Sequence, residues 1–187
     1  DLDGALESGS NDSVIDLILE QARSHGVSVQ VGGGIRSEER IARFDADRII
    51  VGTRAIEDPE WLDSMARKFP DRLVVSIDGK GLDLLVKGWQ SGSSETLDGV
   101  LERVSKLPVA ALLYTNVTVE GRGKGVDWAP AKNIQARSPH PVIHSGGIST
   151  LEDVRGFHDL GAYGIILGSA IYLNRFTYGE AASLVGE

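Results

Sequence analysis

The sequence contains no cysteine and one methionine, and aromatic residues make up only 6% of its 187 positions. Without cysteine the chain can form no disulfide, present no thiol nucleophile and offer no thiolate to a metal. No apolar run approaches the roughly 20 residues that a membrane helix needs, and no signal peptide is visible at the N-terminus. We therefore expect a cytoplasmic protein that has no membrane partner.

Positive charge is also scarce. The chain has 19 Lys and Arg against 27 Asp and Glu, which gives a formal net charge of −8. Clustered basic side chains hold nucleic-acid backbones, so a nucleic-acid partner is not expected. A small phosphorylated ligand is compatible with this charge, because backbone amides and one or two basic residues can hold it. The length and the 41% hydrophobic content predict a single domain over residues 1–187.

Glycine is abundant, and its placement reveals an internal duplication. Gly33-Gly34 and Gly146-Gly147 each follow an apolar run and open a segment with helical periodicity. Each pair is followed by a second apolar run that ends in glycine and a hydroxyl residue, at Gly52-Thr53 and at Gly168-Ser169. The two copies are 113 residues apart at the first motif and 116 at the second. A repeated unit of this size points to a fold built from two similar halves.

These glycines predict phosphate binding. A strand that delivers glycines to a helix start exposes backbone N–H groups to an anion with no Cβ in the way. One such pair would be equally consistent with a tight turn, but two copies with matching Gly-Thr and Gly-Ser partners favour two phosphate sites. The first is expected at Gly33, Gly34, Gly52 and Thr53, and the second at Gly146, Gly147, Gly168 and Ser169.

Apolar strands alternate with amphipathic helices along the chain, which is typical of a parallel α/β fold. Residues 1–4 read as the end of a strand, and residues 82–89 as a loop with a short extended part. Complete strands are expected at 27–31, 48–51, 73–77, 109–114, 141–144 and 163–167. Helices are expected at 11–26, 37–44, 58–69, 95–106, 129–136, 151–160 and 177–185.

The duplication predicts the architecture. Aligning the halves leaves strand 73–77 without a partner, which predicts one more strand and helix upstream, about 30 residues by the size of such a unit. Two halves of four units give a (βα)8 TIM barrel with twofold internal half-barrel symmetry. Its first βα unit and most of its second strand are then absent from this sequence. An open doubly wound sheet is the alternative, but it does not explain the duplication.

In such a barrel the active site lies where the strands end. Asp78 follows the most buried-looking strand and is the expected proton-transfer group, because burial can tune a carboxyl there. It could instead be a solvated loop residue or a helix cap. Arg36 is expected to orient a phosphate or a carboxamide, unless it is a plain surface charge, and Trp89 either contacts the ligand or packs its loop. The four histidines are scattered, and neither a metal constellation nor a Ser/His/Asp arrangement is evident.

Seven short motifs occur in one order over nearly the whole chain. They are Asp1-Leu2-Asp3-Gly4-Ala5, Gly32-Gly33-Gly34-Ile35-Arg36-Ser37, Val51-Gly52-Thr53, Ser76-Ile77-Asp78, Lys87-Gly88-Trp89, Tyr114-Thr115-Asn116 and Ser145-Gly146-Gly147-Ile148. In order and spacing the chain resembles the ProFAR isomerases of histidine biosynthesis. The resemblance implies a twofold-symmetric TIM barrel that converts the aminoaldose ProFAR to the aminoketose PRFAR by an Amadori rearrangement, without metal or cofactor. The substrate of that family carries two phosphates.

The resemblance also implies roles for residues. Asp78 matches the family's general acid, which protonates the ring oxygen so that the ribose opens, and Thr115 matches a residue expected to hydrogen-bond near the reacting sugar. Arg36 and Trp89 match substrate contacts. The family's general base, an Asp at the end of strand one, has no counterpart in this sequence, so these residues alone are expected to make little PRFAR. Asn116 and Glu120 stand where many members have Asp. A complete barrel is expected to be a monomer.

Three alternatives stay open. The first is the sister barrel, the cyclase of imidazole glycerol phosphate synthase, although the Gly-Gly-Gly-Ile-Arg-Ser and Lys-Gly-Trp motifs favour the isomerase. The second is a dual-substrate isomerase that also accepts phosphoribosyl anthranilate. The third is an inactive partial barrel that only binds phosphate.

Overall fold

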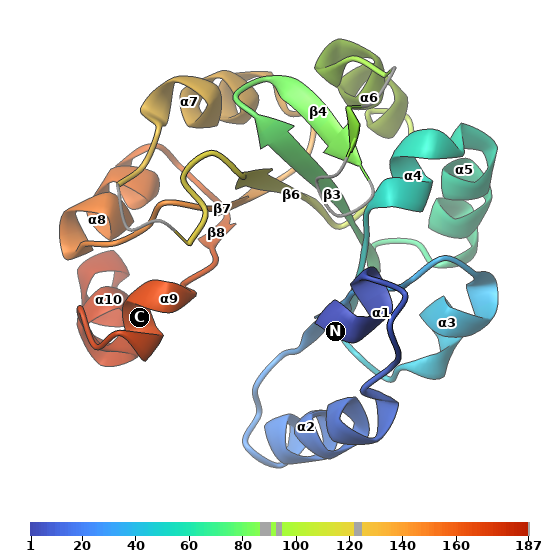
Figure 1. Cartoon of the computed structure of the whole chain (residues 1–187), viewed down its shortest axis with the longest axis horizontal. Coiled ribbons are helices and arrows are strands. Elements are labelled where there is room, and N and C mark those ends of the chain that lie inside the picture. Colours follow the sequence, from blue (N-terminus) through green and yellow to red (C-terminus); the bar gives the residue numbers. More distant parts are fainter. Residues whose placement is uncertain (87–90, 93–94, 122–124, 187) are drawn as a thin grey trace.

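A computed structural model describes residues 1–86, 91–92, 95–121 and 125–186. Within these residues, six parallel strands form one sheet whose strands neighbour each other in chain order. The strands are β1 (Gln30–Gly32), β2 (Arg48–Val51), β3 (Leu73–Lys80), β6 (Ala111–Asn116), β7 (Val142–Ser145) and β8 (Gly164–Ile165). All six were predicted, and Figure 1 shows that the sheet is strongly curved, with the first and last parts of the chain as its two arms.

Two short antiparallel strands extend the sheet at its centre. β4 (Asp83–Val86) folds back on the end of β3, and β5 (Ser91–Gly92) pairs with β4. The sequence pattern predicted only a short extended part here. Trp89, a predicted ligand contact, lies outside the described residues.

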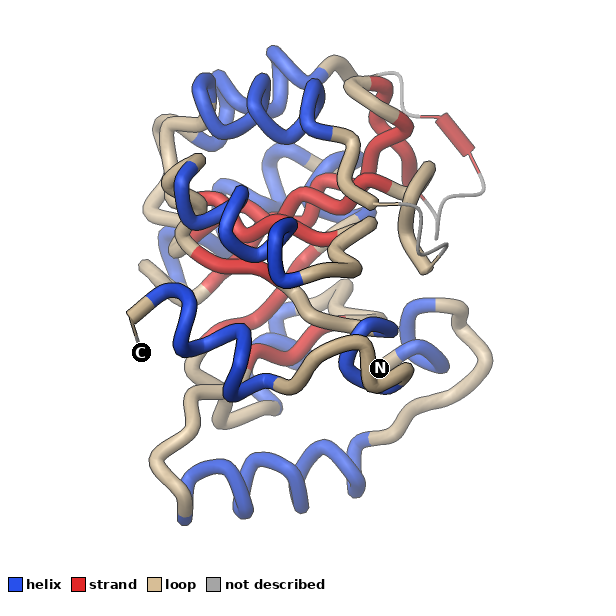
Figure 2. The backbone as a smooth tube through the Cα atoms, turned by 90° about the vertical axis from the view of Figure 1, so that its left-hand side faces the viewer, coloured by secondary structure: helices blue, strands red, loops and turns tan. Residues whose placement is uncertain are grey.

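Most of the helices lie outside the curved sheet, as Figures 1 and 2 show from two directions. The helices are α1 (Leu2–Ala5), α2 (Asp12–Ser24), α3 (Glu38–Arg43), α4 (Thr53–Glu57), α5 (Pro59–Lys68), α6 (Leu97–Val104), α7 (Trp128–Arg137), α8 (Leu151–Asp159), α9 (Ser169–Tyr172) and α10 (Tyr178–Val185). The short helices α1 and α9 lie nearer the space between the two arms in Figure 1. The seven predicted helices are present, with ends shifted by a few residues. The short helices α4 and α9 were not predicted, because a single turn gives no periodicity to read. None of the described helices is both long and apolar enough to cross a bilayer.

Side chains at the helix starts explain where several helices begin. Thr150 and Asp153 form a capping box at α8, and Thr177 and Glu180 form another at α10. Asp58 accepts a hydrogen bond from the Trp61 N–H at 3.0 Å, directly before the proline that opens α5. These contacts satisfy N–H groups that the first helical turn leaves without partners.

The prediction that residues 1–4 end a strand is wrong, because these residues begin a helix. The Asp1 carboxylate accepts the Gly4 N–H at 3.0 Å, and the Ala5 N–H donates to the Asp1 carbonyl at 3.0 Å. The Asp1 nitrogen donates to the carbonyl of Gly32, which places it beside the end of β1. The capping hydrogen bond of Asp1 therefore favours a helical turn here, and the apolar Leu2 beside it does not make the segment a strand.

The two faces of the sheet carry different cores. The helix-facing side holds the large cluster, in which Leu73, Leu112 and Val142 are at most 1% exposed. The opposite face holds a small cluster formed only by the strands, with Val74, Ala111, Leu113 and Ile143. The inner face is therefore apolar in the first half of the central strands, and its polar residues, Ser76 among them, lie toward the carboxyl ends.

One contact joins the arms of the curve near the amino ends of their strands. Arg48 at the start of β2 donates to the Tyr163 hydroxyl at 2.5 Å, and its guanidinium lies 5.1 Å from the centre of that ring. Tyr163 directly precedes β8, 115 residues further along the chain. A hydrogen bond combined with a cation–π contact holds these arms in their curved arrangement.

His144 is buried in β7, and its burial should make the free energy of unfolding depend on pH. Its Nε2 lies 3.0 Å from the Gln135 side-chain oxygen, its Nδ1 has no hydrogen-bond partner among the described residues, and burial lowers its pKa to about 4. Protonation therefore favours the unfolded chain, so the stabilisation is present above pH 6.5 and is lost as the pH falls toward 4. Between pH 7.5 and pH 5 we expect a loss of about 2 kcal/mol from this group.

Urea unfolding at the two pH values measures this loss. H144Q should reduce the pH dependence by that amount, whereas H158Q, at an exposed histidine on α8, should leave it unchanged. An unaltered pH dependence in H144Q would show that another group is responsible.

Candidate active site

Three polar residues form a row at the carboxyl ends of adjacent strands. Asp78 on β3 is in register with Thr115 on β6, and Thr115 is in register with Ser145 on β7. Register partners in a parallel sheet share a face, and this is the inner face that carries Val74 and Leu113. The structure therefore brings the predicted acid, Asp78, next to the predicted sugar contact, Thr115.

The surroundings of this row are partly enclosed. Thr115 is 8% exposed, and the Asp78 carboxylate lies 3.3 Å from the Ser76 hydroxyl, which can donate a hydrogen bond to it. Asp78 itself is half-buried at the mouth of the curve. A carboxyl group in this position can exchange a proton with a ligand and still be held in one orientation by its neighbours.

Glu120 extends the polar row toward β7. Burial raises the pKa of its carboxyl, and the nearby charge of Asp78 raises it further, while a hydrogen bond with Ser145 opposes the shift. Both interactions place the Glu120 carboxyl close to the row. No decisive role was expected for Glu120, because the sequence of a glycine-rich loop does not indicate which residues a glutamate in it faces.

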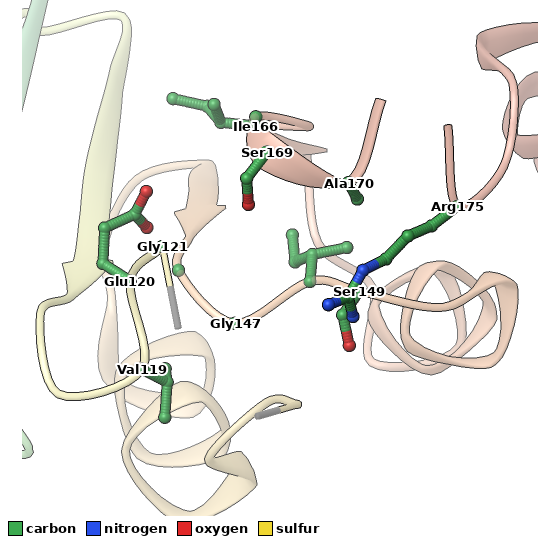
Figure 3. A pocket seen from close by; sticks show the side chains of 12 residues that line it. Val119, Glu120, Gly121, Gly147, Ser149, Ile166, Ser169, Ala170 and Arg175 are labelled. Atoms are coloured by element: carbon green, nitrogen blue, oxygen red, sulfur yellow. The ribbon is translucent and has the colours of Figure 1, made fainter. Parts of the chain in front are cut away.

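A small hollow lies beside this row, between the loops that follow β6, β7 and β8 (Figure 3). All four residues of the second predicted phosphate site line it: Gly146, Gly147, Gly168 and Ser169. Its remaining lining is Val119, Glu120, Gly121, Ile148, Ser149, Ile166, Ala170 and Arg175. Its volume is about 20 Å³, so only a compact group fits its closed part. Arg175 was not among the predicted site residues, because it lies beyond the short helix that follows the Gly-Ser motif.

The glycine pairs are needed because the preceding loop packs on them. A Cβ on Gly34 would lie 2.7 Å from the Gly4 carbonyl oxygen, and one on Gly146 would lie 2.6 Å from the Asn116 carbonyl oxygen. A Cβ on Gly33 would collide with the Asp1 carbonyl, and one on Gly147 with the Gly125 carbonyl. All four have positive φ, between 70° and 99°, which L side chains rarely adopt. The glycines therefore allow two stretches of backbone to stack at each site.

The first predicted phosphate site is less compact. Thr53 and Arg36 line a wide hollow of about 640 Å³, together with Arg54, Ala5, Leu6, Glu7, Glu57 and Asp58. Gly33, Gly34 and Gly52 are not part of this lining. Gly52 directly precedes α4 with φ −116° and ψ −108°, close to the −99° and −110° of Gly168 before α9. The backbone thus takes the same course at both Gly-hydroxyl motifs.

Arg36 is held by the chain itself. Its guanidinium donates to the carbonyl oxygens of Gly4 and Ala5 at 3.3 and 3.1 Å and lies 3.3 Å from the Glu7 carboxylate. These contacts secure the end of α1 over the loop after β1. The predicted contact of Arg36 with a ligand stays a prediction.

Comparison with known protein families finds one family that matches most of this chain. The model of the family described as histidine biosynthesis protein matches residues 1–177. The chain belongs to this family. The match includes every polar residue of the row and both glycine pairs.

Three relatives of this chain carry the same name. A protein of Myxococcus xanthus is 40% identical over 94% of this chain and 74% of its own length. Proteins of Methanosarcina mazei and Halobacterium salinarum are each 39% identical, over 97% and 99% of this chain and 76% and 77% of their own lengths. Each is named 1-(5-phosphoribosyl)-5-((5-phosphoribosylamino)methylideneamino) imidazole-4-carboxamide isomerase, which denotes ProFAR isomerase.

The stacked glycines make a prediction about stability. G147A adds a Cβ that collides with the Gly125 carbonyl and with Val119, at a residue whose φ is +82°. We expect the free energy of unfolding to fall by about 2–4 kcal/mol, from backbone strain and overpacking together. G179A is the matched control, since Gly179 lies in helix α10 and a Cβ there meets no atom of the described residues within 4 Å. Equal melting temperatures for the two variants would contradict the stacking.

Proposed function

We propose that this protein catalyses the isomerisation of ProFAR to PRFAR in histidine biosynthesis. The observation that carries the proposal is the position of Asp78, in register with Thr115 and next to a glycine-lined hollow. Membership of the family, and relatives at about 40% identity that are named for this reaction, support it. No cofactor is assigned, because proton transfers suffice for an aldose–ketose conversion.

The proposed substrate suits the two ends of the site. The relatives' name describes a molecule with two phosphoribosyl groups. One phosphate would lie in the hollow at Gly147 and Ser169, and the other near Gly34 and Thr53. The two Gly-hydroxyl motifs have nearly equal backbone angles, which supports equivalent tasks for them. The middle of the substrate would then lie over Asp78 and Thr115.

A curved parallel sheet also supports a wider proposal about the fold. Six strands in chain order with outer helices are what part of a (βα)8 barrel with two similar halves would contain. In such a barrel the carboxyl ends of all strands face one opening. Residues from both halves then reach one ligand there.

In the proposed mechanism Asp78 acts as the general acid. It gives a proton to the ring oxygen of the aminoaldose ribose, so that the bond from this oxygen to the anomeric carbon breaks and the nitrogen lone pair forms a C=N bond. A base then removes the proton from the neighbouring carbon, which gives an enaminol. Addition of a proton to the former anomeric carbon and loss of the enol hydroxyl proton give the aminoketose, so that no proton is gained or lost overall. Thr115 lies beside Asp78 and is positioned to hydrogen-bond the opening sugar, and the apolar inner cluster beneath limits the access of water.

Replacement of the acid tests the function. D78N keeps the shape of the side chain but cannot deliver the proton, so kcat should fall by roughly 10²–10⁴-fold. D83N is the matched control, because Asp83 is an exposed carboxylate on neighbouring β4 and loses the same charge. Conversion of ProFAR to PRFAR is followed directly. Equal turnover by both variants would refute the role of Asp78, and no turnover by a polypeptide that also carries the family's general base would refute the function.

Glu120 predicts a pH dependence of anion binding. Its pKa is raised by burial, so it ionises later than an exposed glutamate as the pH rises, and its charge then opposes an anion in the hollow. Sulfate keeps its charge over this range and is a suitable probe at constant ionic strength. At pH 8, E120Q should bind sulfate about 3–10-fold more tightly than the unmodified protein, since one like charge is removed. At pH 4 the difference should be small, and an equal gain at both pH values would contradict the explanation.

A further inference from the structure

We propose that Arg175 binds the phosphate that enters the hollow between the β7 and β8 loops, and that it makes this the stronger of the two anion sites. The inference rests on the proposed function for the identity of the ligand as a substrate phosphate. It goes beyond that function in assigning a cationic contact outside the glycine motifs. It also assigns unequal strength to two sites that the duplication would make alike.

The chain around Arg175 turns the side chain back toward the hollow. After α9 the backbone reverses at Asn174, whose φ is +52°, and the Arg175 N–H donates to the Ala170 carbonyl at 2.9 Å. The next residue, Phe176, is buried and anchors the turn in the core of α8 and α10. Figure 3 shows the Arg175 side chain extending into the hollow beside Ser149, with Ser169 on the adjacent wall.

The charge of Arg175 is available to a ligand. Among the described residues, no carboxylate forms an ion pair with its guanidinium, and no side chain or carbonyl accepts a hydrogen bond from it. Most other described arginines have a carboxylate partner, in the pairs Arg23–Asp45, Arg36–Glu7, Arg40–Asp12, Arg43–Asp16, Arg54–Asp58, Arg67–Asp63, Arg103–Glu95 and Arg137–Asp98. Arg175 is exposed and differs from these arginines in that it lines a hollow while its guanidinium has no acceptor among the described residues.

Among the side chains that line the hollow, Arg175 and Ser169 are the ones that we expect to donate hydrogen bonds to a phosphate. The Ser149 hydroxyl already lies 3.2 Å from the Asp153 carboxylate, to which it donates, and Glu120 brings a negative charge to the wall. A phosphate beside Glu120 in a chain of net charge −8 needs a cation to offset the repulsion. A planar guanidinium is suited to this, because it can give two parallel hydrogen bonds to phosphate oxygens.

The first site lacks such a free cation among the residues that line it. Arg36 is held by two carbonyls and Glu7, and Arg54 donates to the Arg36 carbonyl at 2.6 Å and to Asp58 at 3.1 Å. A phosphate there would have to compete with these acceptors. The two sites therefore share glycine geometry but differ in charge, and we expect the site at Arg175 to bind an anion more tightly.

Sulfate titrations of the protein, followed residue by residue through amide NMR shifts, test the inference. Amides near Gly147 and Ser169 report on one site and the Thr53 amide on the other. R175Q should weaken the sulfate binding that the amides near Gly147 and Ser169 report about tenfold, and it should leave the binding that the Thr53 amide reports unchanged. A tenfold loss is expected when a charge-assisted hydrogen bond is removed at a solvent-accessible site. R175K should restore part of the affinity, because it keeps the charge without the planar pair of donors.

R155Q is the matched control. Arg155 is an exposed arginine on α8 that does not line the hollow, so the variant has the same change in net charge. It should leave sulfate binding within twofold. Equal sulfate affinity in R175Q and R155Q would overturn the inference and make Arg175 a solvated surface charge.

Kinetics separate this inference from the proposed function. R175Q should raise the KM for ProFAR about tenfold with kcat nearly unchanged, since the phosphate contact is the same in ground and transition states. An unchanged KM in an active R175Q enzyme would refute the role of Arg175 and leave the function intact. Arg175-dependent sulfate binding without any ProFAR turnover, in a polypeptide that also carries the family's general base, would refute the function and leave Arg175 as an anion contact.

Discussion

The site depends on close contact between backbone segments at the strand ends. At Gly33, Gly34, Gly146 and Gly147 the preceding loop lies where a Cβ would otherwise be, and positive φ angles turn the chain sharply after the strand. Because the loops stack, each one is held by the next along the curve rather than extending separately into solvent. This stacking places Glu120 over the row formed by Asp78, Thr115 and Ser145, and it gives the hollow beside β7 a fixed wall. A single side chain at these positions would separate the loops and open the site.

Most of the sheet could be predicted from the sequence, because its central strands β3, β6 and β7 are largely buried on both faces and read as continuous apolar runs. The start of the chain could not. In residues 1–4 one capping carboxylate decides the conformation, and Leu2 is exposed rather than part of a strand. The strands β4 and β5 were also missed as strands, since they pair only with each other and with the end of β3. Such local pairing depends on where the partner lies, and a short sequence window does not contain that information.

The candidate site likewise contains residues that could be predicted from the sequence and residues that could not. Asp78, Thr115 and the glycines follow apolar runs directly, so the sequence predicted their place at the strand ends and the structure brings them together. Glu120 and Arg175 lie several residues beyond a strand end, after a turn whose path only the folded chain determines. Arg36 was predicted from its place beside the glycines, but the sequence could not show that Gly4, Ala5 and Glu7 already occupy its guanidinium. The repeated glycine motifs therefore predict where the backbone of a site lies, but they do not predict which charged side chains surround it or what those side chains are paired with.

The difference between the two halves has a consequence for how a two-phosphate ligand would be oriented. The backbone angles at Gly52 and Gly168 are nearly equal, so backbone geometry alone would accept the ligand in either direction. The proposed acid, in contrast, must meet one particular ribose. An uncommitted cation at one end and committed cations at the other would give the two phosphate sites different affinities, but a ligand with a phosphate at each end fills both sites in either direction. The proposed orientation therefore depends on the groups between the phosphates, which would meet the side chains of Asp78 and Thr115. In a duplicated fold, the side chains that break the symmetry are then as important for the reaction as the residues that the two halves share.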